Sequence, residues 1–137
     1  MKAQTGLEYI AILTLMLALI IPLFFVANQR LEVARVSNGA KIAMNAIVDS
    51  VDTIYSQSPG SRITTKVYIP DGYDSANSYF ANTTIVMSYY MFDGASHEIL
   101  GFIKGNASGR LPPYPGHHVM TFYLNETGQV IVNTTAQ

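Results

Sequence analysis

The feature that most constrains the fold of this chain is a long uncharged segment near its N-terminus. No charged residue occurs between Glu8 and Arg30, and residues 10–26 (IAILTLMLALIIPLFFV) are almost all apolar. As an α-helix, an uncharged segment of about 21 residues is about 30 Å long, which matches the hydrocarbon core of a bilayer. The segment is too long for the apolar core of a simple secretory signal, and no small-residue cleavage site follows it. The sequence therefore predicts a hydrophobic membrane helix at residues 4–27.

The helical pattern continues beyond the apolar residues. In residues 28–58, apolar side chains recur at steps of three and four, while charged side chains fall mostly outside that stripe, so the helix becomes amphipathic. Pro59-Gly60 ends the pattern, and Pro22 in the apolar half is expected to kink the helix or open it locally. We expect one helix over residues 7–55. Its expected stripe consists of Val33, Val36, Ala40, Ala43, Ile47, Val51 and Ile54.

The remainder of the chain, residues 61–137, has the composition of strands and turns. β-branched and aromatic runs alternate with turn sequences such as Pro70-Asp71-Gly72 and Asn125-Glu126-Thr127-Gly128. The fold class predicted is α+β: a long N-terminal helix packed on a small C-terminal antiparallel β-sheet domain. Strands are expected at residues 62–69, 83–92, 98–104, 118–124 and 129–133.

Composition limits the chemistry that this chain supports. Its 137 residues suffice for one domain, and the absence of cysteine excludes disulfides, thiol catalysis and cysteine-ligated metals. A formal net charge of −1 supplies no basic field for nucleic acid. His117 and His118 adjoin at the start of a strand, where neighbours point to opposite faces, so both are expected as exposed turn histidines, like His97. We predict no enzyme activity, no metal site and no cofactor.

The sequence also contains acceptor motifs for N-glycosylation, in which Asn is followed two residues later by Ser or Thr. All lie in the C-terminal part, at turns or near strand ends, where surface glycans are attached. The tyrosines of the same part fit either ordinary packing in a β domain or an adhesive patch. The candidate glycosylation sites are Asn82, Asn106, Asn125 and Asn133.

Immediately before the apolar run stands the segment Gln4-Thr5-Gly6-Leu7-Glu8-Tyr9-Ile10. With the long apolar helix and the β-rich C-terminal part, this segment resembles the archaeal type IV pilin family, the class III signal peptide family. The fold expected from the resemblance is pilin-like. Two later segments are similar, more loosely, to pilin turns: Val67–Gly72 and Leu111–Val119.

The resemblance implies how the chain is processed and assembled. Residues 1–3 would be a leader, with Ala3 its last residue and Gln4 the first residue after cleavage by a prepilin peptidase. An assembly ATPase and a membrane platform protein would then move the chain from the membrane into an extracellular filament on the cell surface. Its partner there would be itself, as a helical homopolymer, and its role adhesion. The residues expected to act in assembly are Glu8, Tyr9, Leu19, Pro22 and Phe24.

Two questions stay open at this point. Glu8 either begins the helix as a hydrated carboxylate, favoured by the helix dipole, or neutralises the α-amine that cleavage would expose at Gln4. The function class also has an alternative: a membrane-anchored, minor pilin-like surface protein that presents its β domain for binding and does not polymerise.

Overall fold

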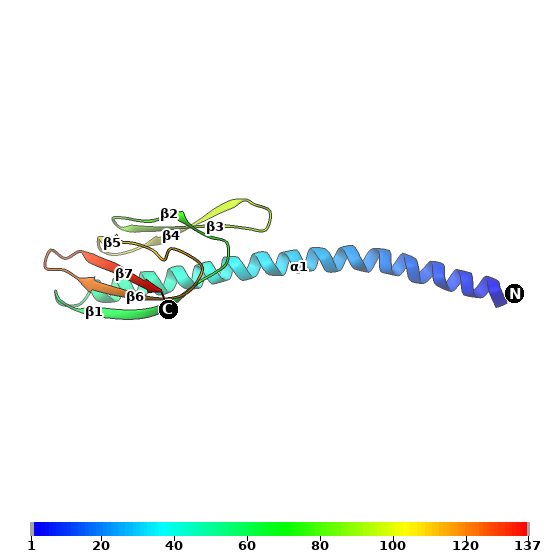
Figure 1. The fold of residues 1–137 in the computed structure, drawn as a ribbon, viewed down its shortest axis with the longest axis horizontal. Coiled ribbons are helices and arrows are strands. Elements are labelled where there is room, and N and C mark those ends of the chain that lie inside the picture. The colour runs from blue at the N-terminus through cyan, green and yellow to red at the C-terminus, as the bar shows by residue number, and fades with distance from the viewer. Residues whose placement is uncertain (1, 137) are drawn as a thin grey trace. The chain divides into compact units, whose positions relative to one another are not determined.

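The computed structural model of the chain describes residues 2–136, and the side chains of residues 4–135. One long helix precedes all the strands (Figure 1). Contacts between residues divide the chain into two units, Met1–Ala34 and Arg35–Gln137. The elements are α1 (Lys2–Tyr55), β1 (Arg62–Ile69), β2 (Tyr73–Ala81), β3 (Thr84–Tyr90), β4 (Ser96–Phe102), β5 (Ala107–Gly109), β6 (Gly116–Leu124) and β7 (Val130–Ala136).

The first unit is the N-terminal part of α1. Every side chain from Gln4 to Glu32 is exposed. The helix begins at Lys2, five residues before the start that the sequence predicts, and it continues without a break through Pro22. The local opening expected at this proline is therefore absent. Pro22 has no N–H to donate to the carbonyl of Ala18, and the turns on either side keep the helix continuous across that missing bond.

In the second unit, the last part of α1 packs one side against the strands. The expected stripe is confirmed from Ala40 onward, because those apolar residues are at most 2% exposed, while Val33 and Val36 are only half-buried. The sequence pattern missed Met44, which is 2% exposed, and Ser50, which is 8% exposed. Ser50 avoids an unsatisfied hydroxyl by pairing with Thr65 of β1 at 2.9 Å and donating to the carbonyl of Ala46.

The strands form two sheets, where the sequence predicts one antiparallel sheet. The first has the order β1-β6-β7-β5, and the second has the order β2-β3-β4. All pairs are antiparallel except β5 and β7, which run parallel, so the first sheet is mixed. The α+β class and the packing of a long helix on a C-terminal β domain are confirmed.

Both sheets contact α1. A Cβ atom added to Gly101 in β4 would overlap Met44 Sδ and lie 2.7 Å from Val48 Cγ2, so this glycine allows the second sheet to approach the helix closely. The first sheet supplies Met120, Phe122 and Leu124 from alternate positions of β6, each at most 3% exposed. The core therefore lies between the helix and the inner faces of the two sheets.

Candidate functional site

We define the apolar segment as Leu7–Val26 of α1. Of the residues expected to act in assembly, Tyr9 is 71% exposed, Leu19 62% and Phe24 68%. Large apolar side chains are exposed around the whole circumference of the helix here, not along one stripe. The helix that contains this segment is long and apolar enough to cross a membrane.

Burial energy shows how unfavourable this segment would be in water. Fully covering one large apolar side chain is worth about 1.5–3 kcal/mol, so more than a dozen half-exposed ones represent about 20 kcal/mol. That exceeds the net stability of an ordinary domain, about 5–15 kcal/mol. Covering the segment with an apolar environment, either lipid or other protein chains, would therefore be strongly favourable.

Glu8 lies one residue after the start of the apolar segment, on the helix and exposed. It forms no ion pair with any residue that the structure describes. The nearby Thr14 hydroxyl donates within the helix, to the carbonyl of Ile10 at 2.8 Å. Gln4 is helical and exposed, but Met1 and the side chain of Ala3 lie outside the described residues. Leader cleavage therefore stays a prediction, as does a partner for Glu8.

The candidate glycosylation sites gather mainly at one end of the β domain. The carbonyl of Asn82, in the β2–β3 turn, accepts the N–H of Ala107 at 3.0 Å, and the carbonyl of Asn106 accepts the N–H of Val130 at 2.9 Å. Asn125 lies in the adjoining β6–β7 turn, where its Oδ1 accepts from Thr127 and Gln129. The bonds of Asn82 and Asn106 use the backbone carbonyl, and those of Asn125 use the side-chain Oδ1, so none of them uses Nδ2, the atom that a glycan would modify. Asn133 is separate, exposed on β7.

The histidines only partly match the expectation. His117 and His118 do point to opposite faces, with His117 exposed against the ring of Tyr68 at 4.9 Å between centroids. His118, however, is 1% exposed, so its prediction as an exposed turn residue is wrong. Its Nε2 lies 2.8 Å from the carbonyl of Tyr114, which assigns the proton to Nε2. The buried Nδ1 has no partner among the described residues. The alternation of buried residues along β6 was the signal that places His118 inside.

Hydrogen bonds between polar side chains stabilise an irregular part of β2. The register between β2 and β3 shifts between Asp74 and Tyr79, which marks a β-bulge. The hydroxyl of Ser78 accepts the N–H of Ser88 at 2.9 Å, and the carboxylate of Asp74 accepts from Asn77 Nδ2 at 2.7 Å. Its other oxygen accepts the N–H of Ala76. The hydrogen bond from Asn77, followed by that from Tyr90, holds the pKa of Asp74 below its ordinary value.

Two tyrosines beside the bulge are also perturbed. Burial raises the pKa of Tyr73, whose hydroxyl has no hydrogen-bond partner among the described residues. Donation to Asp74 at 3.0 Å raises the pKa of Tyr90, because the neutral phenol is the form that makes this bond. Both shifts therefore trace to the packing and hydrogen bonds that hold the bulge in place.

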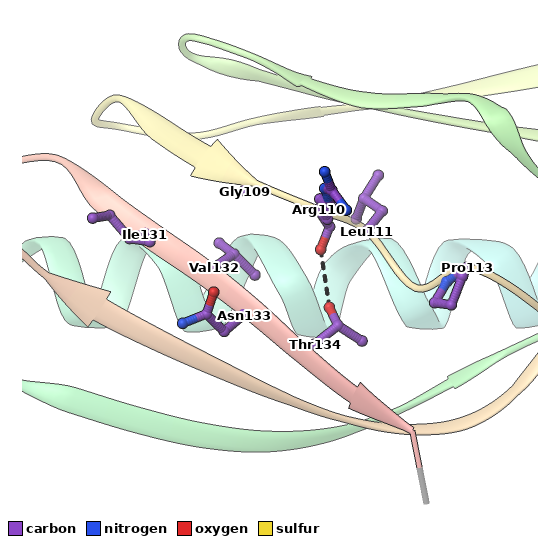
Figure 2. Close-up of a pocket in the computed structure, with 8 residues that line it drawn as sticks. All are labelled: Gly109, Arg110, Leu111, Pro113, Ile131, Val132, Asn133 and Thr134. Atoms are coloured by element: carbon purple, nitrogen blue, oxygen red, sulfur yellow. Dashed lines mark hydrogen bonds between the residues drawn. The ribbon is translucent and has the colours of Figure 1, made fainter.

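A groove that the sequence did not predict follows β5. It has a volume of about 530 Å³ and lies along β7 (Figure 2). A smaller cavity of about 380 Å³ shares Gly109, Arg110, Leu111 and Pro113 with it and reaches the bulge in β2. The signal available in the sequence was the Gly109-to-Pro113 segment, in which a glycine and two prolines end the strand. The groove is lined by Gly109, Arg110, Leu111, Pro113, Ile131, Val132, Asn133 and Thr134.

Comparison of the chain with protein-family models, with curated proteins and with solved structures found no match in any of the three. Among residues 2–136, no three or more His, Asp or Glu side chains are grouped to hold a metal ion. The candidate functional elements are therefore the apolar segment of the first unit and the surface of the β domain.

Proposed function

We propose that this chain is the structural subunit of an archaeal type IV adhesion pilus. It is a single-pass membrane protein before assembly and then polymerises into an extracellular filament through its apolar segment. The observation that carries the proposal is the apolar segment itself: a helix exposed on all sides, joined to a second unit whose core includes none of its residues. Such a helix needs other chains once it leaves the lipid.

The sequence before the helix supports the same proposal. Glu8 and Tyr9 occupy the positions at which archaeal pilins carry an acidic and an aromatic residue, and Ala3 is a small residue before Gln4. A prepilin peptidase cuts between Ala3 and Gln4, and an assembly ATPase with a platform protein moves the chain into the filament. Glu8 then neutralises the new α-amine of the same or a neighbouring chain. A neighbouring helix packed in the wrong axial register would leave the Glu8 carboxylate unpaired in apolar surroundings, which is unfavourable.

Close packing between helices, rather than transfer of apolar side chains out of water, drives assembly of the filament. The apolar segment is in an apolar environment both in lipid and in a bundle of helices, so moving it changes little hydration free energy. What is gained is close contact between helices. Side chains such as Leu19 and Phe24, exposed on the single chain, are the ones that such contacts cover.

Shearing of whole cells tests the proposal. Filaments released by shear should contain this chain as their main band, and the intact mass of that band should begin at Gln4. The chain found only as a membrane monomer would overturn the filament proposal. A filament subunit that still carries Met1 would overturn the cleavage step alone.

The second candidate is a membrane-anchored binding protein that does not polymerise. The groove beside Arg110 is the observation in its favour, because a filament backbone has no need of an open groove on its β domain. The shear experiment separates the two, since this candidate predicts membrane monomer and no filament band.

A further inference from the structure

We infer that the groove beside Arg110 is a binding site for a carboxylated saccharide. The inference concerns the β domain alone and holds whether or not the chain forms a filament. It rests on four observations: an opening built by the backbone, an anchored loop, a free guanidinium and a mixed polar and apolar lining.

The opening is a consequence of how β5 ends. β5 pairs with β7 over only three residues, from Ala107 opposite Val130 to Gly109 opposite Val132. Gly109 has a φ of +146°, and a Cβ atom there would collide with the carbonyl oxygen of Val132. Only glycine fits this turn, after which the chain leaves β7 and the groove begins.

The bulge in β2 opens the other side. Ser75, Ser78 and Tyr79 of this irregular part of β2 line the smaller cavity, which adjoins the same Gly109–Pro113 segment. Ser78 is fixed by its bond to the N–H of Ser88, so the bulge is held open by a buried hydrogen bond. The two cavities therefore flank one segment, and their volumes fall within the range of small-molecule sites.

Arg110 is the second residue of this segment; its backbone is fixed by a hydrogen bond, and its side chain is exposed. The hydroxyl of Thr134 donates to the carbonyl of Arg110 at 2.9 Å, and in Figure 2 the guanidinium points away from that bond. Arg110 is exposed and makes no ion pair with any residue between positions 2 and 136. The acidic residue of the bulge, Asp74, is already bonded to Asn77 and Tyr90. A guanidinium presented in this way binds a carboxylate through two parallel hydrogen bonds.

The remaining lining identifies the ligand class. Asn133 in the groove and Ser75 in the smaller cavity offer neutral hydrogen-bonding groups. Tyr79, which also lines the smaller cavity and is 54% exposed, supplies an aromatic ring for the apolar side of a sugar. Among the described residues, Arg110 is the one cationic side chain that lines either cavity, which disfavours a polyphosphate. One cation, neutral polar groups and an aromatic face together fit a uronic-acid-type sugar.

Binding to the full chain in detergent tests the inference. The chain is produced in a host without N-glycosylation, so that no glycan on Asn133 occupies the groove. Titration calorimetry uses a trimer of galacturonic acid, the matching neutral galactose trimer and inorganic phosphate. We expect the acidic trimer to bind with a Kd of about 1 mM or tighter and the neutral trimer to bind at least tenfold more weakly.

Matched variants assign the binding to Arg110. Arg110→Gln should weaken the acidic trimer about tenfold or more, and Arg110→Lys should fall between, because lysine keeps the charge and loses the paired geometry. Arg62→Gln removes the same charge from an exposed position on β1, at the opposite edge of the first sheet, and should leave binding within about twofold. Unchanged thermal midpoints confirm that the variants are folded.

Several results would overturn the inference. These are no binding of the acidic trimer at about 10 mM, equal binding of both trimers, or equal losses from Arg110→Gln and Arg62→Gln. Phosphate that binds as tightly as the acidic trimer would show an unspecific anion site instead.

Discussion

Glu8 stands beside the apolar segment, exposed and without an ion pair among the described residues. We predict that Glu8→Ala leaves membrane insertion intact and lowers the yield of sheared filaments. Insertion should be unaffected or easier, because a charge is removed near the bilayer boundary. Assembly should fail, because the α-amine of Gln4 loses its partner. The measurement is the amount of this chain in the sheared and membrane fractions.

Glu32→Ala is the matched control, since Glu32 is exposed on the same helix beyond the apolar segment. It should give normal filament yield. Equal yields from wild type and Glu8→Ala would reject the pairing role and leave Glu8 as a hydrated carboxylate at the helix start.

The Asp74 carboxylate makes the stability of the β domain depend on pH. Its folded-state pKa lies below the ordinary value of 3.8, so the stabilisation is complete above that value and is lost as the pH falls through the folded pKa. We predict that the thermal midpoint of the wild type exceeds that of Asp74→Asn at about pH 6, and that the gap narrows by about pH 2.

Asn77→Ala serves as the control for the cause of this term. It removes the hydrogen bond that lowers the pKa most, while its backbone carbonyl still accepts from Ser88. In the Asn77→Ala background, the loss of thermal midpoint caused by Asp74→Asn should depend less on pH. A difference in thermal midpoint between the wild type and Asp74→Asn that is constant from about pH 6 to pH 2 would show that the Asp74 hydrogen bonds do not stabilise the folded state through its pKa.

Which single residues the sequence could predict depends on whether their environment is local. Glu8 could be singled out because its apolar neighbours are adjacent in the chain, and its role in assembly stays a prediction. His118 was misassigned because its adjacency to His117 was given more weight than the alternation of buried residues along β6, whose inner face packs in the core with α1. Arg110 was missed because its groove combines β2, the segment after β5, and β7.

Within the last part of α1, a substitution on the buried apolar stripe should destabilise the fold more than a substitution on the exposed side of the helix. Ile47 is 0% exposed, whereas Ile42 is 70% exposed on the same helix. We predict that Ile47→Asn lowers the free energy of unfolding of the β domain by about 3–5 kcal/mol, because it removes apolar contacts and buries an unsatisfied amide. Ile42→Asn should cost no more than about 1 kcal/mol.

Urea unfolding in detergent measures both variants. Near-ultraviolet circular dichroism of tyrosine reports on the second unit, because the chain has no tryptophan and Tyr9 alone among the tyrosines lies in the first unit. Similar losses from Ile47→Asn and Ile42→Asn would show that the stripe does not carry the helix–sheet packing.

Elements with a strong pattern were predicted, and elements fixed by tertiary contacts were not. β1 was predicted with its observed bounds, because RITTKVYI is rich in β-branched residues. β2 was missed, because YDSANSYFA is mostly polar around a bulge. β5 has only three residues and is defined by its partner β7. The second sheet and the parallel pair depend on these two strands, so the sequence predicted one antiparallel sheet.

The division of the chain into two units predicts how it behaves when the first is removed. A chain that begins at Asn28 keeps all of Arg35–Gln137 and lacks the apolar segment. We predict that it is a soluble, folded monomer, because its core is complete without that segment. Sedimentation and near-ultraviolet circular dichroism check this. If this truncated chain polymerises, the apolar segment is not the assembly element.

The apolar segment, exposed on the single chain, is covered by other copies in the proposed filament, and the reactivity of a thiol placed in it tests this directly. The chain has no cysteine, so Leu19→Cys places one thiol in the segment and Glu126→Cys places one at the exposed β6–β7 turn. Sheared filaments washed free of lipid are treated with a water-soluble maleimide before and after dissolution in detergent. We predict that the thiol at position 19 reacts only after dissolution, whereas the thiol at position 126 reacts at once. Equal and immediate reaction at both positions in intact filaments would show that other copies do not cover the apolar segment.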